Sequence, residues 1–341
     1  MSEFRVPSLM RMRTDSRLLA DQPERAVQAM RSVAFCAFTD VDEQARIFSG
    51  WDLDYTQISR GAFSGSSSIA SIGGVRVLVE HLDKVILQRG SVPAGRIAIA
   101  VPLELDGHAR MCGHASGRDS LHVFSSVEEF EFFSPDHHVL ANVEIHVDEI
   151  DSDALRVFAG SLAKTDMAPV VPMSEATAQR FRDVLRHALS ITVTQTGRER
   201  AMALQGAVLS LLSEVLEHGA RDQTRSVAPH ASHAALVAAT QRCLEVAETC
   251  PLSIAELCGQ LGVSRRTIQY AFQHVIDLNP VAYLRAVRLN HVRRALRSGD
   301  SVTAAATKWG FLHLGSFAQD YRTMFGELPS ETVRRCRRAS V

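Results

Sequence analysis

The first half of the chain contains short runs in which apolar and polar residues alternate. These runs lie between about residues 51 and 147, and turn-forming pairs such as Gly73-Gly74 separate them. Alternation with a period of two is typical of strands that bury one face. The pattern predicts strands at residues 55–58, 75–82, 96–101, 120–124 and 139–147. Many short strands at regular spacing favour a small barrel or a sandwich.

After Pro172 the apolar residues are spaced three and four apart, which is the pattern of amphipathic helices. Two helices are predicted within residues 174–218. The apolar stripe of the first consists of Phe181, Val184, Leu185, Ala188 and Leu189. The stripe of the second consists of Leu204, Val208, Leu211, Leu212 and Val215. A stripe needs only some apolar partner, so the second stripe predicts either a homodimer contact through helices 174–218 or packing on its own domain.

A polar stretch broken by Pro229 then interrupts the helical pattern. Such a stretch is typical of an interdomain linker. We therefore predict domains at residues 1–218 and 234–341, joined by a linker at 219–233.

The C-terminal part begins with a helix, a glycine turn and a second helix. Ser253 and Glu256 have the spacing of a capping box, Gly262 suits a sharp turn, and Ser264 is placed to cap the next helix. This second helix is predicted to bury Ile268, Ala271, Phe272 and Val275. Its outward face is predicted to carry Arg265, Arg266, Gln269, Tyr270 and Gln273. Arginine pairs with guanine and glutamine with adenine in the major groove, so this face predicts DNA recognition.

The same arrangement recurs after a long helix that Asn279 and Pro280 begin. Ser301 is placed to cap the next helix, and Trp309-Gly310-Phe311 forms the second turn. The following helix is predicted to bury Leu314, Phe317, Tyr321 and Phe325. It is predicted to expose Ser316, Gln319, Arg322 and Thr323.

The long helix also predicts how far apart the two outward faces lie. At about 1.5 Å per residue, its roughly 19 residues span about 28 Å. One turn of DNA is about 34 Å, so both recognition helices are expected to enter successive major grooves on one face. Arg288 falls within the apolar stripe of the long helix. We predict a structural role for it, with Asp277 or Asp320 as its partner.

Charge is distributed unevenly along the 341 residues. The net charge is −1, but residues 241–341 contain 14 Lys and Arg against 8 Asp and Glu. Thirteen of these 14 cations are arginine, which is suited to bidentate contacts with phosphate or guanine. The remaining residues contain 23 basic and 30 acidic side chains. A basic end on an acidic body indicates a polyanionic partner, here double-stranded DNA.

Several other classes lack support in the sequence. No apolar run approaches the roughly 18 residues of a membrane span, and the N-terminus has no apolar core, so a cytoplasmic protein is expected. The six cysteines form no C-x-x-C pair, and the histidines form no H-x-H pair. Glycine-rich phosphate loops and nucleophile motifs are absent as well. We therefore expect no metal, no cofactor, no catalytic residues and no enzyme activity.

Residues 236–335 resemble the DNA-binding domain of the AraC/XylS family of bacterial transcription regulators. The resemblance rests on Ser264–Phe272, Tyr283–Leu289, Trp309–Phe311, Phe317 and Phe325–Pro329. It implies DNA contacts from Ser264, Arg265, Arg266, Gln269, Tyr270, His313, Leu314, Ser316, Gln319 and Arg322. The family usually has serine at the position of Gly315, and glycine weakens helix initiation. The stretch around Gly315 is similar to a subgroup that includes the ethanolamine-operon regulator.

The resemblance also implies what the N-terminal part does. The expected fold is α+β, with an N-terminal β-barrel or cupin-like regulatory domain and flanking helices. An all-α domain of two helix-turn-helix units joined by a long helix follows. The N-terminal domain would bind a small-molecule effector and dimerise, and the protein would act as an activator that contacts RNA polymerase. A metabolite-binding or metal-dependent barrel enzyme with an accessory DNA-binding domain remains the alternative.

Polar and aromatic residues of the predicted strands are candidates for binding an effector. These candidates are Trp51, Tyr55, Arg76, Glu80, His122 and Glu144. If the subgroup resemblance extends to the effector, a small amine would pair with Glu80 or Glu144.

Overall fold

The computed structural model describes most of the chain after residue 33. The described residues are 34–72, 74–107, 109–124, 129–150, 153–162, 168–190, 203, 205–215, 231–246 and 252–339. Residues 32–341 form one compact unit. The predicted linker at 219–233 lies outside the described residues up to residue 230, and a helix begins at Ala231.

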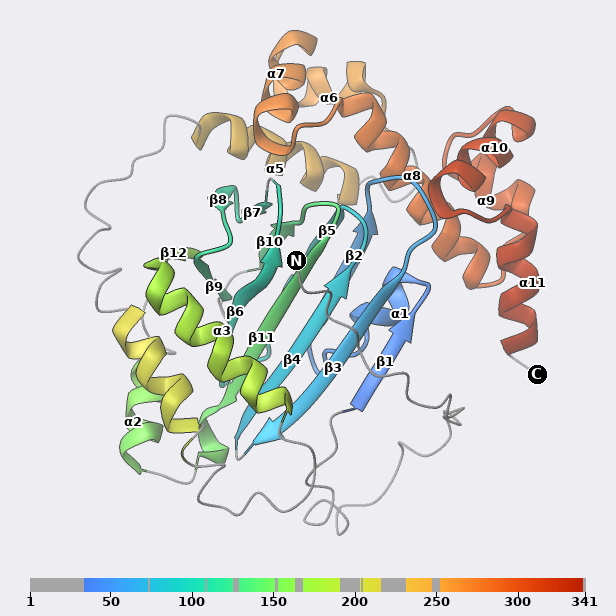
Figure 1. Cartoon of the computed structure of the whole chain (residues 1–341). Helices are drawn as coiled ribbons and strands as arrows, with labels where there is room; N and C mark the ends of the chain where they lie inside the picture. The colour runs from blue at the N-terminus through green and yellow to red at the C-terminus, as the bar shows by residue number, and fades with distance from the viewer. Residues whose placement is uncertain are drawn as a thin grey trace. The chain divides into compact units, whose positions relative to one another are not determined.

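Two antiparallel sheets form the β-rich part (Figure 1). The seven-stranded sheet has the order β1 (Ala34–Phe38), β3 (Gly65–Ile72), β4 (Val75–Leu82), β11 (His138–His146), β6 (Arg96–Leu105), β9 (Ser120–Phe124) and β12 (Val170–Pro172). The five-stranded sheet has the order β2 (Asp52–Gln57), β5 (Ile86–Ser91), β10 (Phe130–Phe133), β7 (Ala109–Met111) and β8 (His114–Ser116).

The prediction of a closed barrel is wrong, because the two sheets do not join into one ring. Among the described strands, β1 and β12 are the edges of one sheet, and β2 and β8 are the edges of the other. Apolar side chains from both sheets pack in a shared core, as Leu140 does with Phe132. The architecture is therefore a two-sheet sandwich, whose closure depends on side-chain packing rather than on a continuous ladder of hydrogen bonds.

The alternation seen in the sequence separates the two faces of the central strands. In β4, Val75 and Val77 belong to the core on the outer face, whereas Leu78 and Leu82 belong to a core on the inner face. Strand β11 pairs with both β4 and β6, which places Glu144 opposite Arg76 and Ala98. Successive side chains point to opposite faces, so the polar residues of these strands on the inner face lie between the sheets.

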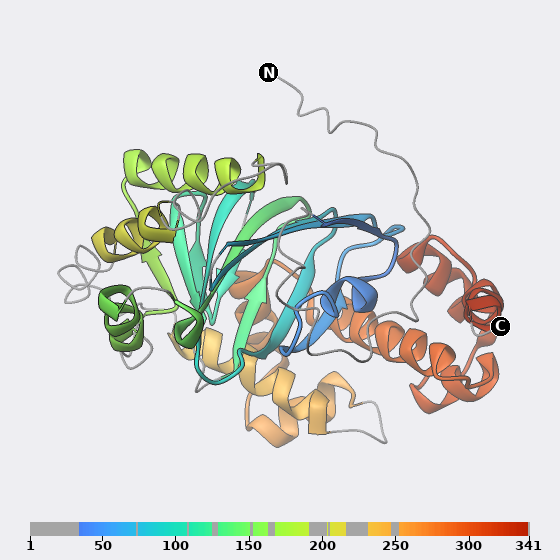
Figure 2. The same cartoon turned by 90° about the horizontal axis from the view of Figure 1, so that it is seen from below.

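Helices cover the outer face of the seven-stranded sheet. They are α2 (Asp153–Leu162), α3 (Glu175–Ser190) and the helical residues 205–215. Figure 2 shows α3 lying across this sheet. Phe181 and Leu185 of α3 share a core with Val208 and Leu212 and with the strands. The described members of the second predicted stripe are thus buried within their own chain, while Leu204 lies outside the described residues.

The C-terminal part is helical, as predicted. Its elements are α5 (Ala231–Val246), α6 (Ile254–Leu261), α7 (Arg265–Ile276), α8 (Pro280–Arg297), α9 (Val302–Lys308), α10 (Leu314–Phe325) and α11 (Pro329–Ala339). Pro329 is the first residue of α11, a position that suits proline. The core of these helices also contains Ile58, Leu87 and Phe133 of the β-rich part. The two parts therefore share one apolar core.

Candidate nucleic-acid interface and buried polar clusters

The first helix-turn-helix unit has the capping groups that the sequence predicts. The Ser253 hydroxyl accepts from the backbone N–H of Glu256 at 3.3 Å, and the Glu256 carboxylate accepts from the N–H of Ser253 at 2.7 Å. Gly262 ends α6 with φ +64°, a left-handed conformation that favours glycine. Ser264 then caps α7 by accepting from the N–H of Thr267 at 3.1 Å. These local contacts fix the angle at which α7 leaves the turn.

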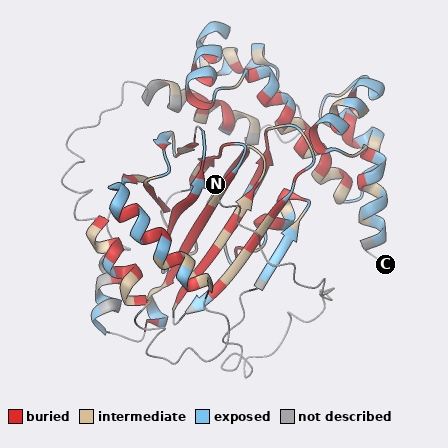
Figure 3. Cartoon of the chain, in the orientation of Figure 1, coloured by how far each residue is buried: buried red, intermediate tan, exposed pale blue. Residues whose placement is uncertain are grey.

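Helix α7 presents a polar face to solvent. Ile268, Ala271 and Phe272 are fully buried, whereas Arg266 and Gln269 are exposed, which confirms the predicted facing of this helix. Exposed faces of α7 are visible in Figure 3. The Arg266 guanidinium donates to the Tyr270 hydroxyl at 3.2 Å and lies 5.3 Å from the centre of its ring. This contact holds a planar cation on the outward face of the helix.

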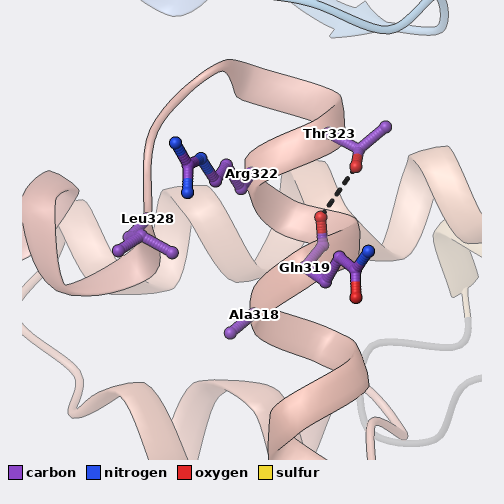
Figure 4. Close-up of a pocket in the computed structure, with 5 residues that line it drawn as sticks. All are labelled: Ala318, Gln319, Arg322, Thr323 and Leu328. Atoms are coloured by element: carbon purple, nitrogen blue, oxygen red, sulfur yellow. Dashed lines mark hydrogen bonds between the residues drawn. The ribbon is translucent and has the colours of Figure 1, made fainter.

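Helix α10 presents the corresponding face of the second unit. Phe317, Tyr321 and Phe325 are buried, and Ser316, Gln319 and Arg322 are exposed. The prediction that Leu314 is a core residue is wrong, because it lies in the first turn of the helix and is 43% exposed. Figure 4 shows Gln319 and Arg322 lining a hollow beside Leu328, with the Thr323 hydroxyl donating to the Gln319 carbonyl at 2.8 Å. The hollow thus follows the outward face of α10.

The start of α10 shows how Gly315 affects the second unit. His313 occupies the N-cap position without a side-chain hydrogen bond to the helix. Gly315 is the second helical residue, so a serine there would not stand at the N-cap. A Cβ atom added at Gly315 would meet nothing within 4 Å. The glycine therefore weakens the helix through backbone entropy and not through a missing cap.

Replacing Gly315 with alanine is expected to stabilise the protein by about 0.5–1 kcal/mol, because alanine has the higher helix propensity and no neighbour obstructs it. Urea-induced unfolding measures the difference. Gly262→Ala is the control, because the left-handed φ of Gly262 makes that substitution unfavourable. Destabilisation by Gly315→Ala would show that this position has another constraint.

Helix α8 joins the two units. Its 18 residues span about 27 Å at about 1.5 Å per residue. Arg288 donates to the carbonyl of Leu252 at 2.7 Å, which supports its structural role. The predicted partner Asp320 instead forms an ion pair with Arg285.

The β-rich part places all six effector candidates in polar clusters. In the first cluster, the Glu80 carboxylate accepts from the Tyr55 hydroxyl at 3.1 Å and from the Gln44 amide at 3.1 Å. Glu80 is 1% exposed, and burial raises its pKa to about 7. Within the described part of the chain, no cationic side chain forms an ion pair with Glu80. Gln44 was not predicted, because it lies on the short helix α1 (Val41–Ala45), outside the predicted strands.

The second cluster surrounds Glu144. Its carboxylate accepts from the Trp51 indole at 3.1 Å, lies 3.9 Å from Arg76 and also pairs with Arg96. His146 lies 2.7 Å from the same carboxylate. Arg96 and His146 were missed by sequence reasoning, although they stand opposite each other in the β6–β11 ladder. The Glu144 carboxylate therefore already has a hydrogen-bond donor and two arginine cations beside it.

The third cluster contains two buried histidines. His122 hydrogen-bonds with the Ser116 hydroxyl, and burial lowers the pKa of His122 to about 4. Burial also lowers the pKa of His138 to about 3. The ring of Phe132 lies 5.0 Å from His122 and 6.0 Å from His138. Both histidines are therefore neutral at pH 7.

Some polar atoms in these clusters have no hydrogen-bond partner among the described residues. They include the side-chain oxygen of Gln44, the hydroxyl of Ser67, which stands opposite Glu80 in the β3–β4 ladder, and Nδ1 of His122. Buried polar atoms are usually paired, so these atoms retain hydrogen-bonding capacity for a polar ligand or an ordered water. No three His, Cys, Asp or Glu side chains of the described residues are grouped to hold a metal ion. None of the described helices has the length and apolar character of a membrane span.

Residues 257–335 match the family model of a helix-turn-helix domain. The probable thc operon regulatory protein of Rhodococcus erythropolis is 39% identical over 88 residues, which are 25% of this chain and 26% of that protein. The XylDLEGF operon transcriptional activator of Pseudomonas putida is 36% identical over 91 residues, 26% of this chain and 28% of that protein. This chain thus spans about a quarter of the length of these relatives.

Among solved structures, a probable AraC family transcriptional regulator from Rhodopseudomonas palustris is 40% identical. The match covers 30% of this chain and 96% of that chain, with a TM-score of 0.28. All three similarities concern proteins named as regulators of transcription.

Proposed function

Because its C-terminal quarter is a helix-turn-helix DNA-binding domain of the AraC/XylS type, we propose that this chain is an effector-responsive, sequence-specific transcription regulator. The observation that carries the proposal is the pair of exposed polar helix faces, on α7 and α10, joined by the single helix α8. The span of α8, about 27 Å, supports entry of both helices into successive major grooves.

The contacts proposed for DNA divide between the two recognition helices. Ser264, Arg265, Arg266, Gln269 and Tyr270 belong to the first unit. His313, Leu314, Ser316, Gln319 and Arg322 belong to the second. All ten are exposed to solvent, which is what base and phosphate contacts require.

A genome-wide pull-down of DNA bound by the purified protein, repeated at several salt concentrations, tests this function. We expect enrichment of sites with two half-elements about 10 base pairs apart. Weak, uniform and strongly salt-dependent binding to all DNA would mean that the basic end is only an electrostatic patch.

Arg266→Ala and Gln269→Ala are each expected to relax base preference by about 1–3 kcal/mol, because each removes one bidentate base contact. The folding of both variants should be unchanged, since both side chains are exposed. Competition binding with duplexes altered at single positions measures the effect. Arg334→Ala, which removes an exposed arginine from α11, away from both recognition helices, is the matched control and should leave base preference unchanged. If Arg266→Ala and Gln269→Ala showed the same base preference as Arg334→Ala, the proposed role of α7 would be contradicted.

The inner face of the sandwich is the proposed effector site, and Glu80 is the proposed partner of a small amine. Glu144 is a weaker candidate, because Arg76 and Arg96 already lie beside it. A thermal-shift titration with a panel of small amines tests the idea. Stabilisation of the wild type that is lost in Glu80→Gln supports it, whereas no stabilisation by any amine, or equal stabilisation of the variant, contradicts it.

The cluster around Glu80 also adjoins the elements that contact the DNA-binding helices. Gln44 lies on α1, whose first residues pair with arginines of α8. Tyr55 contacts Glu80 through its hydroxyl, while its backbone carbonyl accepts from Arg294 at 2.8 Å. A ligand that moves α1 or β2 would therefore change contacts with α8, which supports a response to an effector.

The proposal also covers the partners of the protein and its location in the cell. We propose an activator that works in the cytoplasm and contacts RNA polymerase, with no catalytic role. A homodimer through helices 174–218 remains part of the proposal, although the apolar stripe at 208–215 is used within the chain. Such a dimer would use the exposed side of α3. The resemblance to the ethanolamine-operon subgroup remains a prediction.

A further inference from the structure

The β-rich part contacts both helix-turn-helix units. Near the first unit, the Arg110 guanidinium of β7 donates to the carbonyl of His274 on α7 at 3.0 Å. Near the second unit, the segment 57–62, which begins at the last residue of β2, contacts α8 and the end of α10. One domain therefore bridges two DNA-recognition elements that are otherwise joined through α8 and α9.

Gln57 connects three elements at the second unit. Its backbone N–H donates to the Asn290 side-chain oxygen at 3.1 Å, and its carbonyl accepts from the Asn290 amide at 2.8 Å. Its own side-chain amide donates to the carbonyl of Met324 on α10 at 2.9 Å. Gln57 is 1% exposed and Asn290 is 3% exposed. Hydrogen bonds in such buried surroundings define one geometry, because a shifted arrangement leaves buried polar groups unpaired.

The same segment caps the end of α10. The backbone N–H of Gly61 donates to the carbonyls of Thr323 and Met324, at 3.1 Å each. The last carbonyls of a helix have no partner within the helix, so this N–H satisfies groups that would otherwise need water. Gly326 follows α10 with φ +74°, and a Cβ atom at this position would lie 2.7 Å from that of Ala62. The two backbones are therefore in close contact.

Ion pairs fix α8 on the same side. Asp40 caps α1 and pairs with Arg293 at 3.0 Å, with side chains that are 2% and 5% exposed. Burial alone would raise the pKa of Asp40, but Arg293 and Arg297 outweigh it and lower that pKa. Arg294 pairs with Asp42 at 3.2 Å, and Arg297 pairs with Glu43 at 3.1 Å. Separating the buried Asp40 from Arg293 would leave uncompensated buried charges, so this pair opposes displacement of α8 from α1.

From these contacts we propose that the segment 57–62 and Asp40 form a brace that fixes α10 relative to α7 and thereby selects the spacing of the two DNA half-elements. The inference rests on the proposed function, because it assumes that both helices bind DNA. It assigns a specificity role to residues of the β-rich part that do not touch DNA.

DNA geometry explains why a brace would select spacing. Adding one base pair between two half-elements moves the second by about 3.4 Å and rotates it by roughly 35°. Binding both elements at the wrong spacing would require α10 to move relative to α7, and this would break the contacts of Gln57 and Gly61. Without the brace, only the helices of the C-terminal part resist that movement, through their own core and the ion pair between Arg285 and Asp320.

The test measures binding of the full chain to duplexes in which the spacer is shortened or lengthened by one base pair. The duplexes derive from a site selected from random DNA by the wild type, and fluorescence anisotropy gives each Kd. Gln57→Met removes the side-chain amide but keeps the backbone contacts. Asp40→Asn removes the charge facing Arg293. Asp119→Asn is the matched control, because Asp119 pairs with the buried Arg182 at 2.7 Å away from the brace.

We expect a one-base-pair change to weaken binding by the wild type and by Asp119→Asn roughly tenfold or more. The ratio of Kd values at shifted and optimal spacing should fall at least roughly threefold in Gln57→Met and Asp40→Asn. Unchanged ratios in whichever of these two variants fold, as judged by circular dichroism, would overturn the brace. Failure of the wild type to select any site over random DNA would instead overturn the proposed function.

Discussion

Replacing Arg293 with methionine is expected to lower the free energy of unfolding by about 3–5 kcal/mol, because it leaves the buried Asp40 carboxylate without one of its cations. Arg293 also lies 3.4 Å from Glu327 and 4.5 Å from the centre of the Phe325 ring. The substitution therefore removes contacts with α1, with the segment after α10 and with α10 itself. Chemical denaturation of the full chain measures the change.

Arg334→Met is the matched control for this experiment. Arg334 pairs with Glu331 across an exposed helix surface at 3.9 Å, and such pairs contribute about 0–1 kcal/mol. Similar effects of the two substitutions would contradict the assignment of Arg293 to a buried interface. That outcome would also weaken the case for the brace.

The second large effect is a pH dependence that Glu80 causes. Burial raises its pKa from 4.5 to about 7, so at pH 5–7 the folded protein holds a proton that the unfolded chain releases. Stability from this group is therefore complete below about pH 4.5 and is lost as the pH rises through 7. The expected loss is about 3 kcal/mol, from about 1.4 kcal/mol per pKa unit.

Comparison with Glu80→Gln isolates this contribution, because glutamine fills the same position but does not titrate. Unfolding of both proteins is measured at intervals between pH 5 and pH 8. The wild type should lose about 2.5 kcal/mol relative to the variant over this range. The buried histidines His122 and His138 act in the opposite sense, because their lowered pKa values remove stability as the pH falls below 6.5. A constant difference between wild type and variant would show that Glu80 is ionised throughout.

The helix-turn-helix units were predictable from sequence because their signals are local. Ser253, Glu256, Gly262 and Ser264 each act within four residues along the chain, and the structure has all of them in the expected capping roles. The facing of α7 follows in the same way from the period of its apolar residues. Leu314 was misplaced because it lies in the first turn of α10, where the apolar period has too few residues to define a buried face.

The sandwich was less predictable, because strand pairing is a long-range property. Strand β3 was missed since Gly65–Ile72 is rich in serine and lacks the β-branched pattern that marked β4. The strands of open sheets and of a closed barrel show the same alternation of apolar and polar residues. The distinction depends on which edge strands pair, and only the three-dimensional arrangement determines that. Polar residues on the inner face were still predictable, because period two identifies the inward positions of each strand, and their role in binding an effector stays a prediction.

The basic C-terminal block illustrates the limit of counting charges. Its excess of arginine indicated a polyanion, yet Arg293, Arg294 and Arg297 pair with acidic residues of the chain's own α1 and β2. These partners lie about 250 positions earlier in the sequence, so no local pattern links them. The arginines that remain candidates for DNA are those on the outward faces of α7 and α10.

Guanine-N7 methylation protection on a selected duplex tests the central claim most directly, because N7 faces the major groove. Binding by two recognition helices predicts two protected patches on one face of the DNA, about one helical turn apart. Gln319→Ala together with Arg322→Ala should remove protection from one patch and leave the other. A single patch, or protection that is uniform along the duplex, would contradict recognition by α7 and α10 together.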